Sequence, residues 1–395
     1  MKVCDLTQFY SPASGGVKRY VHEKVRYLSA FPENRHLLIV PGERDERLVE
    51  GISTVCTIRS PRVSRISGYR VLLRLEAIDA ILETERPDVI ECGDPYQVAW
   101  KAVRSGQQYG IPVVGFYHSH FAEAYLRHVA QYLGGWVTRQ VMEVARRYVV
   151  SLYNRFSCTV VPSPQLANVL REWGVENVET VDLGVDLETF HPNADLGEWE
   201  ATRAELEIPP EDFLFLYVGR LAQEKNTHTL FEAFRRLPEE TPQGGRYRLL
   251  VVGDGLQRPL VEALERETGR VHWIAYCSDA GRLARYYRCA DLFVHPGVQE
   301  TFGLVSLESQ ACGTPVVGIA GSPMDRIIQT DQSYWARENH AVALAEAMER
   351  SAADPARIRC HGQEAARCVA ERFSWKATFD RLFRIYQSAI DTYKP

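Results

Sequence analysis

The stretch HPGVQETFGLVSLESQACGTPVVG, from His295 to Gly318, decides the fold of this chain. The apolar segment Asp291-Leu292-Phe293-Val294 leads into it and predicts a buried strand. Gly303 then opens a predicted helix, with Glu300 ahead of its N-terminus and Glu308 in its early turns. Backbone N–H groups at a helix start bind phosphate, and carboxylates beside them can bind sugar hydroxyls. Phosphate and sugar in one place indicate a nucleotide-sugar ligand.

Composition is that of an ordinary soluble protein. The chain has 395 residues, enough for two domains, with 45% hydrophobic and 25% charged residues. Its net charge of −5 argues against a general nucleic-acid-binding protein, so we expect no nucleic-acid partner. Apolar runs stay short of the ~20 residues that cross a bilayer, and the N-terminus lacks a signal-peptide layout. We therefore expect a cytoplasmic protein; the sequence indicates no oligomeric state.

Strand and helix patterns alternate in both halves of the chain. Near-continuous apolar runs of this kind predict parallel sheets covered on both faces, and so a fold of two doubly wound α/β domains. The expected strands are 2–6, 36–40, 88–92, 112–118, 158–162 and 178–183, then 213–219, 248–253, 271–276, 291–295 and 315–319. The expected helices include 16–28, 69–85, 96–109, one within 123–153, and 373–393. A segment rich in Pro, Asp and Glu, 184–210, marks the predicted boundary.

Two segments of the first half lie where strands are expected to end. Gly15-Gly16 follows the first strand, and such a pair lets the backbone approach a ligand, although it is also common in plain turns. His118 ends a later strand and could hydrogen-bond a sugar, or serve the structure alone. With His120 it forms an H-x-H pattern, but a third metal ligand at suitable spacing is missing, so we expect no metal site.

Two cationic residues lie after a predicted strand of the second half. Arg220 follows Val218-Gly219, and Lys225 lies where the next helix begins. An Arg fork and a Lys charge on one loop can bind a diphosphate, although a solvated surface pair is the alternative. The sequence lacks a D-x-D motif that would favour a bridging metal. We therefore expect no metal cofactor, with Arg220, Lys225 and helix N-termini neutralising the phosphate.

These motifs together resemble a known family. The chain is similar to retaining GT-B glycosyltransferases of family 4 over nearly its full length. The resemblance rests on Gly15-Gly16, His118, Arg220 with Glu224-Lys225-Asn226, and Glu300 with Glu308. The final Phe373-Ser374-Trp375 also fits the family, whose last helix returns to the N-terminal domain. It implies an acceptor domain at 1–185 completed by 373–395, a donor domain at 186–372, and an interdomain cleft.

The resemblance also implies roles for the matched residues. Arg220 and Lys225 would hold the donor diphosphate, and Glu308 the ribose hydroxyls. Glu300 would hold the hexose with backbone N–H groups of Thr301, Phe302, Gly303 and Leu304. His118 would contact the sugar near the reacting carbon, Gly16 would approach phosphate or acceptor, and the base would stack near Tyr276 and Cys277. The family keeps anomeric configuration by front-face attack, so Glu300 is not assigned as a nucleophile.

The implied reaction moves a hexose from a UDP- or GDP-sugar to an acceptor hydroxyl. The FYHSHFAEAYLRH segment at 116–128 and DLGVDLETFHP at 182–192 are closest to enzymes that glycosylate lipids, so a lipid or glycan precursor is the expected acceptor. One departure follows Gly318, where the family usually has a Gly-Gly pair and an acid. This chain has Gly321-Ser322-Pro323-Met324-Asp325 instead.

An arginine-rich run suggests a further partner. Arg59, Arg62, Arg65, Arg70 and Arg74 follow one another with no acid between them. Such a run can bind anionic lipid headgroups, and we expect peripheral contact with the inner membrane face. A basic surface loop without a partner is an equal alternative.

Two other functions compete with the transferase. One is a nucleotide-sugar epimerase or hydrolase on the same fold, and the other is a non-catalytic nucleotide-sugar-binding module. The combined R-x4-K and E-x7-E motifs argue against both. A dinucleotide oxidoreductase is disfavoured because no G-x-G-x-x-G follows the first strand.

Overall fold

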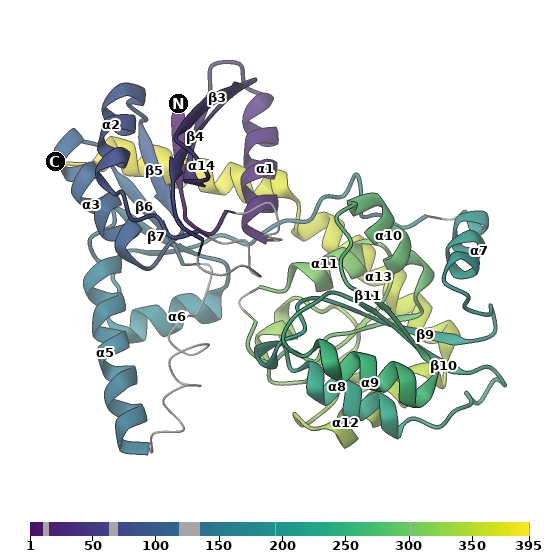
Figure 1. Cartoon of the computed structure of the whole chain (residues 1–395). Coiled ribbons are helices and arrows are strands. Elements are labelled where there is room, and N and C mark those ends of the chain that lie inside the picture. Colours follow the sequence, from purple (N-terminus) through teal and green to yellow (C-terminus); the bar gives the residue numbers. More distant parts are fainter. Residues whose placement is uncertain (11–15, 63–69, 118–134, 194, 301, 395) are drawn as a thin grey trace. The chain divides into compact units, whose positions relative to one another are not determined.

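The computed structural model describes residues 1–10, 16–62, 70–117, 135–193, 195–300 and 302–394 (Figure 1). The chain forms two compact units. Unit 1 comprises Met1–Asp182 and Trp375–Pro395, and unit 2 comprises Leu183–Ser374. Each unit is built around its own sheet, so that each has a separate hydrophobic core.

Unit 1 contains an eight-stranded sheet in the order β3-β4-β2-β1-β5-β6-β7-β8. Its inner strands are apolar and buried on both faces, because helices cover both sides of a parallel sheet. The strands are β1 (Lys2–Leu6), β2 (Arg35–Gly42), β3 (Glu46–Glu50), β4 (Ser53–Arg59), β5 (Val89–Cys92), β6 (Val113–Phe116), β7 (Cys158–Val161) and β8 (Val178–Thr180). The helices are α1 (Gly16–Ser29), α2 (Glu76–Glu85), α3 (Gln97–Tyr109), α5 (Gly135–Tyr153), α6 (Pro164–Trp173) and α14 (Trp375–Thr392).

Strands β3 and β4 were not expected from the sequence. They form a hairpin around Gly51, whose φ of 59° suits the tight turn, and β3 runs antiparallel to β4 at the edge of the sheet. The β3 sequence ERLVE is mostly exposed and carries three charges. An edge strand of this composition lacks the apolar run that identifies a buried strand, which is why the pattern missed it.

Helix α14 belongs to unit 1 although it follows unit 2 in the chain. It packs against α1 through aromatic side chains, with Tyr27 lying 5.5 Å from the Phe379 ring and 5.3 Å from the Phe383 ring. Tyr27 also donates a 2.7 Å hydrogen bond to Asp380. The sequence predicted this helix, and the packing explains its apolar positions.

A buried charge network lies beneath this contact. The Lys24 ammonium is fully buried and lies 2.7 Å from Asp5 and 3.0 Å from Glu91. It also donates to the Tyr386 hydroxyl of α14 at 3.0 Å, and Tyr386 donates to Glu91. Burial alone would raise the pKa of Asp5, but Lys24 holds it well below its ordinary value. Burial outweighs Lys24 at Glu91, whose pKa is raised. The network ties β1, β5, α1 and α14 together.

Unit 2 contains a parallel five-stranded sheet in the order β11-β10-β9-β12-β13. Its strands are β9 (Phe213–Val218), β10 (Tyr247–Val252), β11 (Val271–Ile274), β12 (Leu292–Val294) and β13 (Val316–Val317). Its helices are α7 (Leu196–Glu205), α8 (Thr227–Arg236), α9 (Arg258–Thr268), α10 (Ala280–Cys289), α11 (Leu304–Ala311), α12 (Ala341–Ala352) and α13 (Pro355–Arg372), with the short helices η3 (Gln223–Lys225), η4 (Pro323–Arg326) and η5 (Gln332–Tyr334).

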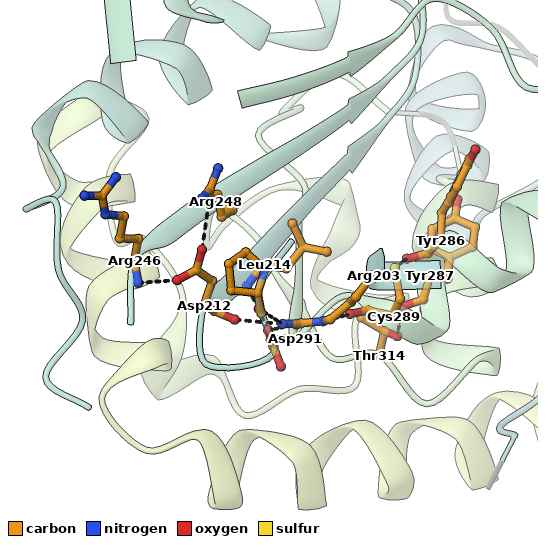
Figure 2. A network of polar contacts seen from close by, with 11 residues as sticks. Arg203, Asp212, Leu214, Arg246, Arg248, Tyr286, Tyr287, Cys289, Asp291 and Thr314 are labelled. Atoms are coloured by element: carbon orange, nitrogen blue, oxygen red, sulfur yellow. Dashed lines mark hydrogen bonds and ion pairs between the residues drawn. The ribbon is translucent and has the colours of Figure 1, made fainter. Parts of the chain in front are cut away.

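Helix α7 lies in the segment that the sequence marked only as a boundary. Its Arg203 is buried and reaches the amino ends of two strands, pairing with Asp291 at 2.5 Å and donating to the Asp212 carbonyl at 2.8 Å (Figure 2). Asp291 in turn accepts the Leu214 N–H at 2.8 Å. This network is at the edge opposite the carboxyl ends, so it serves the structure of unit 2.

Both sheets reverse their winding direction at one point. In unit 2 the chain adds β10 and β11 on one side of β9, then β12 and β13 on the other, so the reversal lies between β9 and β12. In unit 1 it lies between β1 and β5. Ligands of open α/β sheets bind at the carboxyl ends of strands at such switch points.

Replacement of Lys24 by Met tests the buried network. It removes the cation between Asp5 and Glu91 and should lower the free energy of unfolding by about 3–5 kcal/mol, since two buried acids lose their partner. Denaturant unfolding measures this loss. Lys376→Met, an exposed residue of α14, is the control and should change stability little. Equal stability of the two variants would show that the network contributes nothing.

Candidate functional site

The switch point of unit 2 brings two predicted site residues into contact. Lys225 ends η3 after β9, and Glu300 follows β12. The Lys225 Nζ lies 2.5 Å from Glu300 Oε1. These residues are 75 positions apart in sequence, and they meet because β9 and β12 are neighbours in the sheet.

Glu300 is kept ionised although its carboxylate is mostly buried. Burial alone would raise its pKa, but the charge of Lys225 and the nearby His295 hold the pKa of Glu300 well below its ordinary value. His295 Nε2 lies 3.7 Å from the same Glu300 oxygen, and His295 Nδ1 is buried without a partner in the described part of the chain. An ionised carboxylate accepts hydrogen bonds from hydroxyls and donates none, which suits the binding of a sugar.

Helix α11 begins beside Glu300, as predicted. Its N-cap is Gly303, with φ of 83°, and a side chain there would meet the end of the Met324 side chain. Only glycine fits this turn without strain. The N–H groups of Leu304 and Val305 have no acceptor among the described residues and can receive an anion, whereas the N–H of Ser306 donates to the Gly303 carbonyl. The side chain of Phe302 is buried against Phe373, so Phe302 can offer a ligand its backbone only.

Two further predicted residues, Glu308 in α11 and Arg220 after β9, differ in their exposure to solvent. Glu308 is buried and accepts a 3.0 Å hydrogen bond from the Tyr287 hydroxyl of α10. The Arg220 side chain is 57% exposed, and Glu224 lies 3.4 Å away. An exposed guanidinium next to the carboxyl end of β9 is available for an anionic ligand.

Tyr276 and Cys277 follow β11, which β10 and β9 separate from β12 in the sheet. Tyr276 is 64% exposed, and the Cys277 thiol donates to the Asp279 carbonyl at 3.3 Å. An exposed aromatic ring at the carboxyl edge of the sheet can stack on a base.

The remaining predicted residues belong to unit 1. Gly16 is the first residue of α1, the helix that follows β1 in the chain. Gly15, Arg65, His118 and Thr301 lie outside the described residues. Strand β6, which was expected to end at His118, ends at Phe116.

The arginine run is less basic than its sequence indicated. Glu43 lies 2.7 Å from Arg62 and 2.5 Å from Arg70, and Asp45 lies 2.6 Å from Arg74. Asp45 also accepts the backbone N–H of Arg59 at 2.8 Å. The run has no acid within it, but the turn before β3 supplies two, and a local sequence pattern does not show such pairing.

Sequence reasoning missed a buried acid at the switch point of unit 1. Asp94 follows β5 and is fully buried. One carboxylate oxygen accepts the Gln8 N–H at 2.9 Å, and the other has no partner among the described residues. Burial raises the pKa of Asp94 to about 7. A carboxylate directly after a buried strand, in ECGDPY, was the available signal. His295 and Asn226 were inside quoted motifs but received no role.

Comparison with known proteins agrees with this geometry. Residues 14–189 match the family described as Glycosyltransferase Family 4, and residues 199–368 match Glycosyl transferases group 1. A GDP-mannose-dependent alpha-(1-6)-phosphatidylinositol dimannoside mannosyltransferase of Mycobacterium tuberculosis is 32% identical over 402 residues, covering 99% of this chain and 98% of the relative. D-inositol 3-phosphate glycosyltransferase 2 of Catenulispora acidiphila is 30% identical, covering 75% and 69%.

Solved structures share the fold. Sucrose-phosphate synthase from Thermosynechococcus elongatus has a TM-score of 0.79 at 24% identity, covering 99% of both chains. Anabaena HepE, in complex with UDP and glucose, has a TM-score of 0.74 at 17% identity, covering 98% and 100%. Fold and site thus define a glycosyltransferase of the GT-B class. The chain belongs to glycosyltransferase family 4, with a C-terminal region of the glycosyl transferases group 1 type.

Substitution of Lys225 or Glu300 by Ala tests the site. If these residues form the donor site, each variant should lose transfer by about 100-fold or more, because each removes a charge from that site. The melting temperature should change little, which thermal unfolding measures. Arg266→Ala, on the exposed side of α9, is the control and should keep full activity. Near-normal turnover in both site variants would refute the assignment.

Replacement of Asp94 by Asn tests its buried carboxyl. The folded pKa of about 7 lies above the unfolded value of 3.8, so Asp94 stabilises the fold less as pH rises between these values. The stability of the wild type relative to Asp94→Asn should therefore fall from pH 4 to 7, by up to about 1.4 kcal/mol per pH unit. Denaturant unfolding at several pH values measures the difference. A stability difference between the wild type and Asp94→Asn that stays constant from pH 4 to 7 would contradict the prediction. Asp391→Asn, an exposed substitution in α14, is the control.

Proposed function

We propose that this protein is a retaining, metal-independent hexosyltransferase that uses a UDP- or GDP-sugar and glycosylates a lipid or glycan precursor. The observation that carries the proposal is the Lys225–Glu300 contact at the switch point of unit 2, beside the start of α11. It places a cation for phosphate and an ionised acceptor for sugar hydroxyls within one site.

Each group of the donor site has one proposed task. Arg220, Lys225 and the N–H groups at the start of α11 bind the diphosphate and neutralise the charge that grows on it as it leaves. Glu300 binds hexose hydroxyls, Glu308 binds the ribose, and Tyr276 with Cys277 contacts the base. We propose that unit 1 binds the acceptor, with His118 contacting the sugar near its anomeric carbon and Gly16 approaching the phosphate or the acceptor.

The proposed chemistry balances without an enzyme nucleophile. The acceptor oxygen forms a bond to the anomeric carbon on the face from which the diphosphate departs. The bond between that carbon and the phosphate oxygen breaks, and the acceptor proton passes to the departing phosphate. We assign Glu300 no nucleophilic role, because front-face attack needs no enzyme nucleophile and Glu300 pairs with Lys225 through one oxygen. The sequence has no D-x-D motif, which supports a reaction without a divalent metal.

The relatives direct the choice of donor and acceptor. The relative that is similar over nearly the whole chain is named for GDP-mannose and phosphatidylinositol dimannoside, so this pair is the first to test. A hexose donor bound as a UDP-sugar is the second, because HepE is described with UDP-glucose.

Peripheral contact with an anionic inner membrane face stays a prediction, as does the cytoplasmic location. A relative named for a lipid acceptor favours membrane contact, whereas the pairing of Arg62 and Arg70 with Glu43 reduces the charge that this segment offers. Within the described segments, the helices are too short or too polar to cross a bilayer. Co-sedimentation with anionic and neutral vesicles is the measurement that decides, since equal binding to both excludes the arginines as the cause.

A nucleotide screen followed by product analysis tests the proposed function. UDP, GDP and ADP, then their sugars, should raise the melting temperature when they bind, by mass action. With the bound donor and a phosphatidylinositol dimannoside acceptor, NMR of the product should show the donor's anomeric configuration, and EDTA should leave the rate unchanged. Inverted product or loss of activity in EDTA would contradict the mechanism. Conversion of the donor without acceptor would indicate an epimerase or hydrolase.

A further inference from the structure

Asn226 lies directly after Lys225 in an uncommon backbone conformation. It follows η3 and precedes α8, with φ of 58° and ψ of 28°. This left-handed region is unfavourable for most side chains, although asparagine enters it more readily than other residues with a side chain. Glycine would adopt it without strain, so the backbone alone does not require asparagine.

The side chain of Asn226 bonds to the loop after β12, to the segment before α12 and to the first turn of α8. Its Nδ2 donates to the Pro296 carbonyl at 2.8 Å and to Asn339 Oδ1 at 2.8 Å. Its Oδ1 accepts from the Thr229 hydroxyl at 2.7 Å. The amide is therefore bonded at both ends, which fixes its orientation.

These bonds tie together the two loops that carry the donor-binding charges. Pro296 lies on the loop after β12, four residues before Glu300, while Asn226 is bonded covalently to Lys225. A fixed distance between Asn226 and Pro296 therefore limits how far the Lys225 and Glu300 backbones can separate. In the structure their side chains meet at 2.5 Å.

We infer that Asn226 is a positioning residue, which holds the diphosphate-binding Lys225 and the sugar-binding Glu300 in register for one ligand. The inference rests on the proposed function of these two residues. In the proposed site a nucleoside diphosphate contacts Lys225 and the start of α11, whereas a nucleotide-sugar depends in addition on Glu300 at a set distance from Lys225. Asn226 therefore contributes to the selection of the whole nucleotide-sugar over the free nucleotide, because preorganised groups bind without the cost of ordering loops.

The variant Asn226→Gly tests the role of the side chain apart from that of the backbone conformation. The variant keeps the left-handed conformation and loses all three side-chain hydrogen bonds. Calorimetric titration of the wild type and the variant with GDP, UDP, GDP-mannose and UDP-glucose gives the dissociation constants. We expect the affinity for the sugar-bearing donor to fall about tenfold or more, and that for the matching diphosphate to change by less than about threefold. In turnover, KM for the donor should rise together with a fall in kcat, as in a loosened site.

Two further variants identify the route of the effect. Asn339→Ala removes one of the three bonds and leaves the Pro296 link intact, so it should bind both ligands as the wild type does. In a Glu300→Gln background, Asn226→Gly should no longer change the ratio of the two affinities, because the loop that it positions has lost its charge.

Clear results would overturn the inference. An equal loss of affinity for the diphosphate and the nucleotide-sugar, or an unchanged ratio, would assign Asn226 a structural role only. A full effect of Asn226→Gly in the Glu300→Gln background would exclude action through Glu300. A wild type that binds neither ligand would instead overturn the proposed function, and this inference with it.

Discussion

The reversal of winding direction at β9 is the constraint on which the proposed donor site depends. Because β10 and β12 flank β9 and all run parallel, the loops after β9 and β12 leave the sheet at the same edge. Lys225 and Glu300 are far apart in sequence, and this arrangement alone brings them into contact. Helix α11 starts from the second of these loops, so its N-terminus adds backbone donors at the same place.

The pKa values of the buried acids in this protein shift in different directions, which depend on the charges beside each acid. Glu300 and Asp5 each face a lysine, and the pKa of each stays well below its ordinary value. Asp94 faces a backbone N–H and no cation, and burial raises its pKa to about 7. Glu91 shares Lys24 with Asp5, and there burial raises the pKa, so nearby cations and nearby acids together determine how far burial shifts each carboxyl.

Two other polar networks support the units away from the donor site. Lys24 joins α1 and α14 to the sheet of unit 1, and Arg203 joins α7 to the amino ends of strands in unit 2. Both cations are buried and multiply hydrogen-bonded, as a buried charge requires. By joining helices to each sheet, they make a rigid support for the loops that carry the site residues, so that those side chains can be held at set positions.

The sequence by itself determined the order of most strands and helices, the two α/β sheets and the Glu300–Glu308 motif, because apolar periodicity and glycine turns are local properties. It failed for the hairpin of β3 and β4, whose edge strand β3 has exposed and charged residues without that periodicity, and for α7, which is held by a buried arginine. Only the tertiary structure decided that Glu43 and Asp45 pair with the arginine run, that Asp94 is buried beside Gln8, and that Asn226 bonds Pro296. Each of these contacts joins residues separated by many positions, and strand order, which no local pattern encodes, sets the distance between them.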